Sequence, residues 1–263
     1  MLHVKNFIGN YVKIAQFLEI VEYLKNIEVF AMRPVVAFAP ENSTNADLEI
    51  YNEINKELHT QNLVCQPGLR YAQADIMWRL VEDDVLFKSL SKSKQNAIKK
   101  TFEDGVCRIM LEDIILYETM QSCKKFGKMY LGSNDWSIYN NLSIKAYKAE
   151  FPRTDQRYAD KEIDMVIEEN TGNRSLCLAE IKYTFDACKE QQKWLIHNEI
   201  KNRLGNGEIK NRIVLYNGES FFDDKIMYVN IEEYLEVLHD QGIKNTLNWL
   251  CDGGNTQQSL QSL

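Results

Sequence analysis

Two short apolar runs that carry charged residues constrain this chain more than any other feature. Residues 163–167 read Ile-Asp-Met-Val-Ile, and residues 178–182 read Leu-Ala-Glu-Ile-Lys. Side chains of a β-strand point alternately to its two faces. The first run therefore predicts a strand with Asp164 on the face opposite the apolar odd-numbered positions. The second predicts a strand on which Glu180 and Lys182 share a face.

The segment between the two runs predicts how they meet. Thr-Gly-Asn at 171–173 is typical of a turn, so we expect a hairpin that places Asp164 beside Glu180 and Lys182. Charges in apolar strands are costly unless they pair, bind a metal or reach a cleft. The alternative to a functional site is a structural ion pair of Lys182 with either carboxylate at the edge of a sheet.

A third carboxylate lies on an apolar helix face. Helical spacing predicts a helix over 107–123 in which Glu112 falls on one stripe with Ile109, Leu116 and Met120. A solvated glutamate would lie on the opposite side. The neighbouring Asp113 is less well placed, although a shift of one residue would exchange the two.

The combined set suits metal-assisted chemistry on phosphate. Asp164, Glu180 and Glu112 would supply the oxygen ligands that Mg²⁺ or Mn²⁺ prefers, and the ion would keep several waters. The Lys182 ammonium would orient or deprotonate an attacking water and stabilise developing negative charge. We therefore expect phosphodiester hydrolysis.

Glu112, Asp164 and the Glu180-Ile181-Lys182 triplet resemble the signature of the PD-(D/E)XK nuclease superfamily. The resemblance implies an α+β or α/β restriction-endonuclease-like core, in which a central mixed sheet is flanked by helices. It also implies that Asp164 and Glu180 bind the metal, that Lys182 assists the nucleophilic water, and that Glu112 completes the site. A glutamine on the following helix, Gln191 or Gln192, would lie near the site. The alternative for the two glutamines is an exposed surface pair.

A closer resemblance is to the nuclease-like C-terminal domain of unknown function found in a family of prokaryotic AAA-type ATPases. The segments that carry it are 66–71, 110–116, 162–167, 179–182 and 213–219. By that resemblance, the residues before about 105 contain a winged-helix-like connector.

The chain contains no Gly-x-x-x-x-Gly-Lys-Ser/Thr loop, so it is not expected to hydrolyse ATP by itself. It would be either a fragment of a longer ATPase or a relative that lost the motor. Two functions follow from the resemblance: a nuclease that acts on DNA, or a non-catalytic recognition or regulatory domain that serves an ATPase module or another protein partner.

Periodicity and turn residues predict three regions: a mainly helical, winged-helix-like region at 1–105, a nuclease-like domain at 106–240, and a C-terminal helix and tail at 241–263. In the first region we expect helices at 11–24, 71–81 and 91–103, strands at 27–39 and 58–66, and a polar loop at 41–47. In the second we expect helices at 107–123, 188–201 and 231–239, and strands at 128–131, 143–151, 162–168, 175–183, 212–216 and 226–229.

Composition limits the partners. A net charge of -7 argues against a protein that coats nucleic acid through its overall field. The lysines at 88, 92, 94, 99 and 100 form a local basic strip, whose alternative is a solvated helix face. Six scattered cysteines predict reduced core residues. Without a long apolar run or a signal-like N-terminus, we expect a cytoplasmic protein that does not contact a membrane, and the oligomeric state stays open.

Overall fold

The computed structural model describes residues 30–32, 34–40, 43–61, 63–65, 78–79, 81–151, 161–183, 195–223 and 225–253. Contacts within the chain define two compact units. The first contains Met1–Ala31 and Val64–Ile114, and the second contains Met32–Leu63 and Ile115–Leu263. The domain limits near 105 and 240 were predicted from sequence patterns. The two compact units are defined by contacts, so the predicted limits stay predictions.

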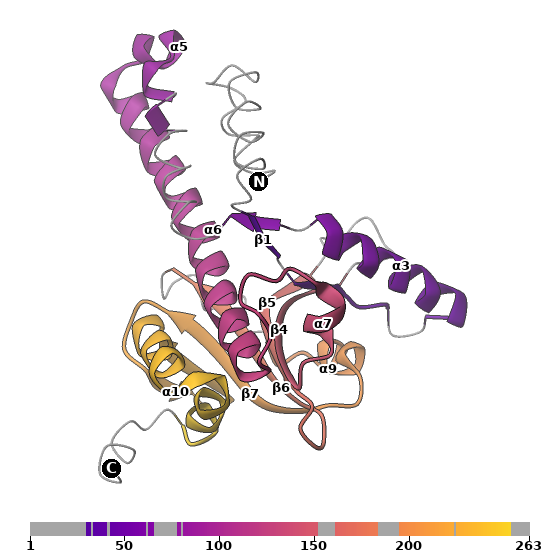
Figure 1. The fold of residues 1–263 in the computed structure, drawn as a ribbon. Coiled ribbons are helices and arrows are strands. Elements are labelled where there is room, and N and C mark those ends of the chain that lie inside the picture. The colour runs from indigo at the N-terminus through magenta and orange to yellow at the C-terminus, as the bar shows by residue number, and fades with distance from the viewer. Residues whose placement is uncertain are drawn as a thin grey trace. The chain divides into compact units, whose positions relative to one another are not determined.

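The second unit is built on a seven-stranded mixed sheet (Figure 1). The strands β2 and β4, β6 and β7, and β7 and β9 are parallel neighbours, whereas β4 and β5, β5 and β6, and β8 and β9 are antiparallel. In spatial order the strands are β2 (Val35–Ala37), β4 (Ile144–Phe151), β5 (Lys161–Glu169), β6 (Ser175–Lys182), β7 (Glu208–Tyr216), β9 (Ile226–Asn230) and β8 (Phe221–Asp223). The chain is therefore of the α+β class, with a mixed sheet flanked by helices, as the sequence predicts.

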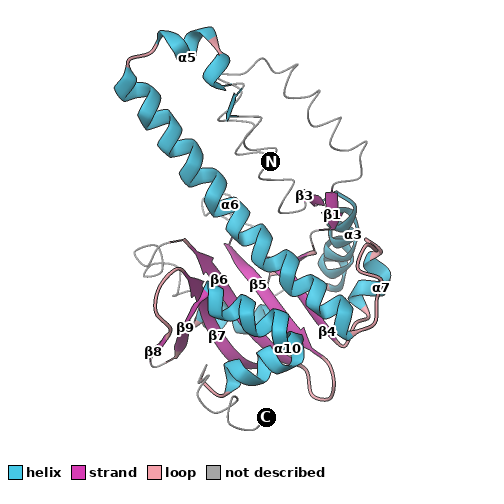
Figure 2. Ribbon diagram, turned by 60° about the vertical axis from the view of Figure 1, so that its left-hand side comes forward, coloured by secondary structure: helices cyan, strands magenta, loops and turns pink. Residues whose placement is uncertain are grey.

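Helices lie on both faces of this sheet. On one face, Ile200 and Leu204 of α9 (Asn198–Leu204) pack with Leu178 and Val214 in the main apolar cluster. On the other face lie α10 (Ile231–Cys251) and the part of α6 (Lys92–Phe126) that starts at Ile115 (Figure 2). The second unit also contains α3 (Asn45–Gln61) and α7 (Trp136–Asn140).

The helix α10 is held at its start and bent in its middle. The side chain of Asn230 accepts hydrogen bonds from the backbone N–H groups of Glu232 and Glu233, which caps the first turn. Gly242 has φ 77 and ψ 168, so the helix is interrupted there before it continues to Cys251. The buried hydroxyl groups of Tyr234 and Thr119 lie 2.8 Å apart, which joins α10 to α6.

The first unit contains α5 (Val85–Ser89) and the N-terminal part of α6. Trp78 packs against Phe87 and Phe102 there, with ring centroids 5.7 and 5.3 Å away. A two-stranded sheet pairs β1 (Phe30–Met32) with β3 (Leu63–Cys65). Among the described residues, none of the helices has the length and apolarity required to cross a membrane.

The strand predicted at 128–131 is wrong, because these residues form a turn after α6. Lys128 has a positive φ of 56, and the ammonium of Lys124 donates hydrogen bonds to the carbonyl groups of Leu131 and Ser133 at 3.1 and 2.7 Å. The Lys124 side chain is fully buried, so its donors need such acceptors. The chain curls around the ammonium instead of extending into a strand.

Two further predictions in the first third are wrong. The polar stretch predicted as a loop to residue 47 starts α3 at Asn45, because Thr44 and Asp47 exchange side-chain-to-backbone hydrogen bonds at the helix start. The helix then runs to Gln61 through the first part of the strand predicted at 58–66. The strand β2 joins the central sheet beside β4, which the assignment of 1–105 to a connector did not anticipate.

The helices predicted at 91–103 and 107–123 are one helix, α6, because an interior glycine such as Gly105 costs only about 1 kcal/mol relative to alanine. The predicted strands over 143–151, 162–168, 175–183, 212–216 and 226–229 are confirmed within a few residues of their limits. The predicted helix at 11–24, most of the one at 71–81 and half of the one at 188–201 lie outside the described residues.

Candidate functional site

A β-bulge adjusts the position of Asp164. Tyr147 on β4 is opposite Val166, and Ala149 is opposite Ile163, so two steps along β4 correspond to three along β5. The additional β5 residue puts Ile163 and Val166 into the same apolar cluster. Strict alternation, which predicted Ile163 on the face away from Val166, is therefore wrong at this point. Bulges redirect side chains and are common beside active sites.

The strands β5 and β6 stop pairing beside this bulge. Their last paired residues are Met165 and Ala179, although both strands continue by several residues. Past that pair, the backbone N–H of Ile181 donates to Asp164 Oδ2 at 2.8 Å. A carboxylate therefore takes the place of a backbone acceptor where the two strands separate.

Asp164, Glu180 and Lys182 form one buried cluster. The Lys182 ammonium lies 2.7 Å from Asp164 Oδ2 and 2.8 Å from Glu180 Oε2. The three residues are 5%, 4% and 7% exposed. Glu180 and Lys182 occupy even-numbered positions of β6, as does Leu178, so the cluster lies on the face of the sheet that α9 covers. The predicted convergence of these three residues is present.

The electrostatics of the cluster show an excess of negative charge. Burial raises the pKa of Glu180 well above its usual range, the Asp164 charge raises it further, and Lys182 opposes both effects only in part. Burial lowers the pKa of Lys182, but the two carboxylates raise it by more, so the lysine stays an ammonium. Two carboxylates thus share one ammonium, and Glu180 tends to hold a proton in the absence of another cation.

The donor set fits a hard divalent cation. Asp164 and Glu180 present oxygen ligands around a position where the protein's own ammonium already acts as the cation. Mg²⁺ is commonly held by one or two carboxylates together with water and substrate phosphate. Within the described ranges, no group of three or more His, Cys, Asp or Glu side chains is arranged to hold a metal ion. Asp164 and Glu180 are the two carboxylates of this cluster among the described residues.

The places of the other predicted site members, relative to this cluster, stay predictions. Glu112 lies on the part of α6 that belongs to the first unit, so its participation stays a prediction. Its side chain is half-buried, whereas the adjacent Asp113 is only 2% exposed, which reverses the expected order of burial. Gln191 and Gln192 lie outside the described residues.

A second buried ionic network, which the sequence did not predict, surrounds Glu168. Glu168 Oε2 accepts hydrogen bonds from the Tyr147 hydroxyl at 2.9 Å and from Arg174 at 2.8 Å, and Oε1 accepts one from Asn170 at 2.8 Å. Burial raises the Glu168 pKa, but Arg174, Asn170 and Lys145 lower it by more, to about 2. Every carboxylate oxygen is engaged by donors of the chain itself, so this network is structural. No spacing in the sequence indicates it, because its members come from two strands and a turn.

Comparisons of the chain with protein-family models, with curated proteins and with solved structures gave no match.

Proposed function

We propose that this chain carries a PD-(D/E)XK nuclease-like domain with a restriction-endonuclease-like core, and that the Asp164–Glu180–Lys182 cluster performs metal-dependent phosphodiester hydrolysis on DNA. The winged-helix-like character of the N-terminal region belongs to the same proposal. The observation that carries it is the sharing of one ammonium by two buried carboxylates at the point where β5 and β6 separate.

A purely structural role explains this arrangement less well. One lysine needs only one carboxylate to balance its charge, and a second buried carboxylate adds a desolvation cost. Burial raises the pKa of Glu180 well above its usual range, which is in keeping with that cost. A divalent cation would remove it by replacing the proton on Glu180. Charge balance therefore supports a cluster that holds a cation.

Each residue has a distinct role in the proposed reaction. Asp164 and Glu180 would hold Mg²⁺ or Mn²⁺, which supplies Lewis-acid activation of water and phosphate when bound. The Ile181 N–H fixes the orientation of the Asp164 carboxylate. Because the Lys182 pKa is raised, its ammonium acts as a hydrogen-bond donor that orients water and stabilises negative charge on phosphate, rather than as a base.

The test is cleavage of plasmid, single-stranded and branched DNA with Mg²⁺ or Mn²⁺. We expect metal-dependent cutting by the wild-type chain and its loss in Asp164→Ala and Lys182→Ala. Lys244→Ala is the matched control, because Lys244 also forms an ion pair, with Glu169, away from the Asp164 cluster. Absence of cutting together with absence of calorimetric Mn²⁺ binding would refute the proposal.

A second candidate function is a non-catalytic recognition or regulatory domain for an AAA-type ATPase module. The observation that favours it is the position of Lys182, whose buried ammonium already fills the space between the carboxylates. For this function we expect no cutting, no heat of Mn²⁺ binding, and equal DNA retention by the wild-type chain and Asp164→Ala in gel-shift measurements. If the wild-type chain bound DNA and Asp164→Ala did not, the result would argue against this second function.

A further inference from the structure

Arg212 is a half-buried cation on the face of the sheet that carries the Asp164 cluster. It lies on β7 opposite Leu178 of β6, and the next residue on the same face, Val214, lies opposite Glu180. Paired residues of neighbouring strands point to the same face of a sheet. Leu178 and Val214 both belong to the main apolar cluster on the side of α9. The Arg212 side chain therefore leaves the sheet on the same side as Glu180.

A β-bulge gives Arg212 this direction. The consecutive β6 residues Leu176–Cys177 are opposite Ile209 and Asn211, so one step along β6 corresponds to two along β7. Lys210 is the additional residue, and it lines a small cavity on the other face, beside α10. Strict alternation from Ile209, which packs against the main apolar cluster, would have pointed Arg212 toward α10. The bulge turns it to the face of the Asp164 cluster instead.

The Arg212 guanidinium has one hydrogen bond and no carboxylate partner among the described residues. Its Nε–H group donates to the carbonyl oxygen of Leu195 at 2.8 Å. A guanidinium carries further N–H groups on its two terminal nitrogens, which stay available to another acceptor. Burial lowers the Arg212 pKa, and no charge of the described chain opposes that effect. Burial also lowers the pKa of Arg174, but there the hydrogen bond and charge of Glu168 raise it by more.

A half-buried guanidinium without a carboxylate partner suits an anionic ligand. Partial removal of a charge from water is costly unless an opposite charge or hydrogen bonds replace the lost hydration. The planar fork of terminal N–H groups matches two oxygens of a phosphate group, as it matches a carboxylate. Arg212 therefore offers both the charge and the donors that a phosphate group requires.

The position of Arg212 suits a strand bound at the Asp164 cluster. Arg212 and Glu180 lie on adjacent strands and are two residues apart in register. A rise of about 3.3 Å per residue and a strand spacing of about 4.8 Å place their Cα atoms roughly 8 Å apart. Long side chains on adjacent strands reach such diagonal neighbours. One bound DNA strand can therefore contact both groups.

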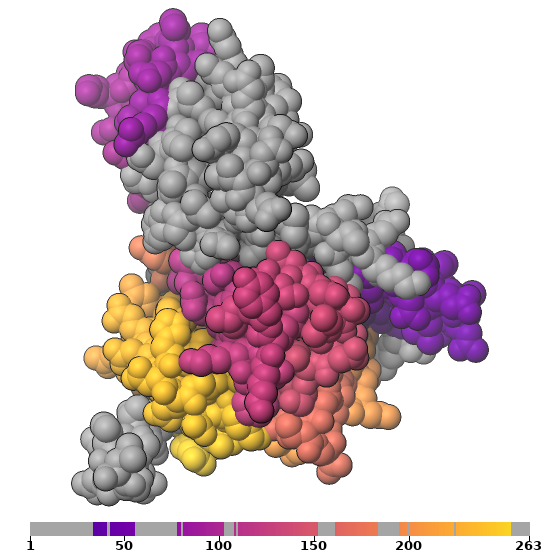
Figure 3. All heavy atoms as spheres, in the orientation of Figure 1, coloured from indigo at the N-terminus to yellow at the C-terminus, as the bar shows by residue number. Residues whose placement is uncertain are grey.

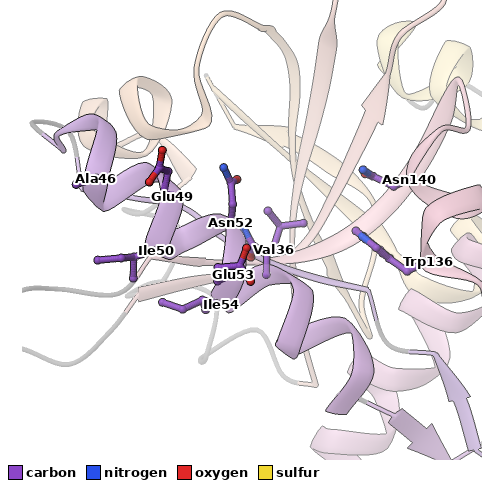
Figure 4. A pocket seen from close by; sticks show the side chains of 10 residues that line it. Val36, Ala46, Glu49, Ile50, Asn52, Glu53, Ile54, Trp136 and Asn140 are labelled. Carbon is purple, nitrogen blue, oxygen red and sulfur yellow. The ribbon is translucent and has the colours of Figure 1, made fainter.

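The large hollow beside α3 is a poorer place for a phosphate. It measures about 1040 Å³, and Figure 4 shows the side chains of α3 on one side and Trp136 and Asn140 of α7 across from them. The space-filling view shows α3, in indigo, at the surface (Figure 3). The described lining residues include Glu49 and Glu53 and no lysine, arginine or histidine. Among these residues a phosphate would find no cation.

We infer that Arg212 binds a backbone phosphate of the DNA strand held at the Asp164 cluster, next to the phosphodiester that is cut. This inference rests on the proposed nuclease function and adds to that site a residue for binding the substrate. A contact of equal strength in the bound substrate and in the transition state lowers KM and leaves kcat unchanged. Arg212 is therefore assigned to substrate binding, and Lys182 keeps its role at the reacting phosphate.

The test compares DNA binding by the wild-type chain and by variants in fluorescence anisotropy without metal, so that no strand is cut. We expect R212Q to weaken binding by about tenfold, as loss of a hydrogen bond between charged groups does. The slope of log affinity against log salt should fall by about one, because one phosphate contact is lost. In cleavage with Mn²⁺, R212Q should raise KM by a similar factor and leave kcat unchanged.

Two further variants separate charge, shape and place. R212K keeps the charge and loses the planar fork, so it should keep the salt slope and lose part of the affinity. K210Q is the matched control, because Lys210 is an exposed cation of the same strand that lines the cavity on the opposite face, and it should bind DNA like the wild-type chain. Circular dichroism and Tm show that each variant is folded. If R212Q does not fold, unchanged affinity in R212K would overturn the inference.

The outcomes distinguish this inference from the nuclease proposal. If the wild-type chain cuts DNA and R212Q binds and cuts equally well, the inference is overturned and the nuclease proposal stands. If the wild-type chain binds DNA with a salt slope that depends on Arg212 but does not cut, the phosphate contact is supported and the nuclease proposal is refuted. Weaker binding by R212Q with an unchanged salt slope would show a structural role and overturn the inference. Calorimetric binding of inorganic phosphate that R212Q abolishes, with DNA binding unchanged, would overturn it in favour of a free anion.

Discussion

The Lys182 ammonium lies 2.7 Å from Asp164 Oδ2, and both side chains are almost fully buried. This contact joins two strands just past their last paired residues, and Glu180 shares the same ammonium. Replacing the ammonium should lower the stability of this cluster and, if the cluster is the proposed metal site, favour binding of a metal ion.

Replacing Lys182 with methionine should destabilise the metal-free chain at neutral pH by about 3 kcal/mol, because two buried carboxylates lose their common counter-ion. Urea unfolding followed by circular dichroism measures the loss. If the cluster binds metal, millimolar Mn²⁺ should restore more stability to this variant than to the wild-type chain, because the ion no longer competes with the ammonium. The triple variant D164N/E180Q/K182M is the control and should show no response to Mn²⁺. An equal response of all three proteins would show that the ion binds elsewhere.

If the proposed site binds Mn²⁺, its affinity for the wild-type chain should rise with pH, since the metal and a proton would compete for Glu180. Burial raises the Glu180 pKa well above its usual range, with Asp164 adding to the effect. A carboxyl group whose pKa is raised by folding stabilises the fold at low pH, and this contribution is lost as pH rises through the raised pKa. Calorimetry in buffers with different ionisation enthalpies should show proton release on binding in the wild-type chain and not in Glu180→Gln. A pH-independent affinity would contradict this linkage.

Glu168 should account for part of the acid sensitivity of the second unit. Hydrogen bonds and charge from Arg174, Asn170 and Lys145 outweigh burial and hold its pKa at about 2, below the ordinary value of 4.5. A depressed pKa stabilises the fold above the unfolded value, and this stability is lost as pH falls from about 4.5 toward 2. We expect Glu168→Gln to lower the free energy of unfolding by about 2 kcal/mol at pH 7 and by much less near pH 2. Denaturation at several pH values measures this, and an equal loss at every pH would contradict it.

Replacing Gly242 with alanine should destabilise the chain by about 1 kcal/mol, because residue 242 has φ 77, a conformation that a side chain makes costly. No atom lies within 4 Å of the position that a Cβ would take there, so the cost is backbone strain and not a clash. Gly172→Ala is the control, since Gly172 is equally open and is not among the glycines with positive φ. Thermal unfolding should show a lower Tm for the Gly242 variant and an unchanged Tm for the Gly172 variant. Equal shifts would contradict a special conformational cost at residue 242.

Local patterns in the sequence predicted the strands that carry the cluster. Glu180 and Lys182 share a face because residues two apart on a strand must do so, and the turn at 171–173 joins β5 to β6 as expected. These features depend on neighbours in the chain, which the sequence displays directly. The same applies to β7, β9 and the start of α10, where the strand predicted over 226–229 leads into the helix predicted from 231.

Contacts between distant parts of the chain decided the rest. The bulge beside Asp164 arises from the register of β5 against β4, and no local period encodes such a register shift. Recruitment of Val35–Ala37 to the sheet depends on pairing with residues more than a hundred positions later. The sequence by itself therefore determined which charged residues share a strand face, because side-chain alternation is a property of the backbone. Only the tertiary structure decided that one buried ammonium serves both carboxylates, because burial and pairing depend on segments brought together by folding.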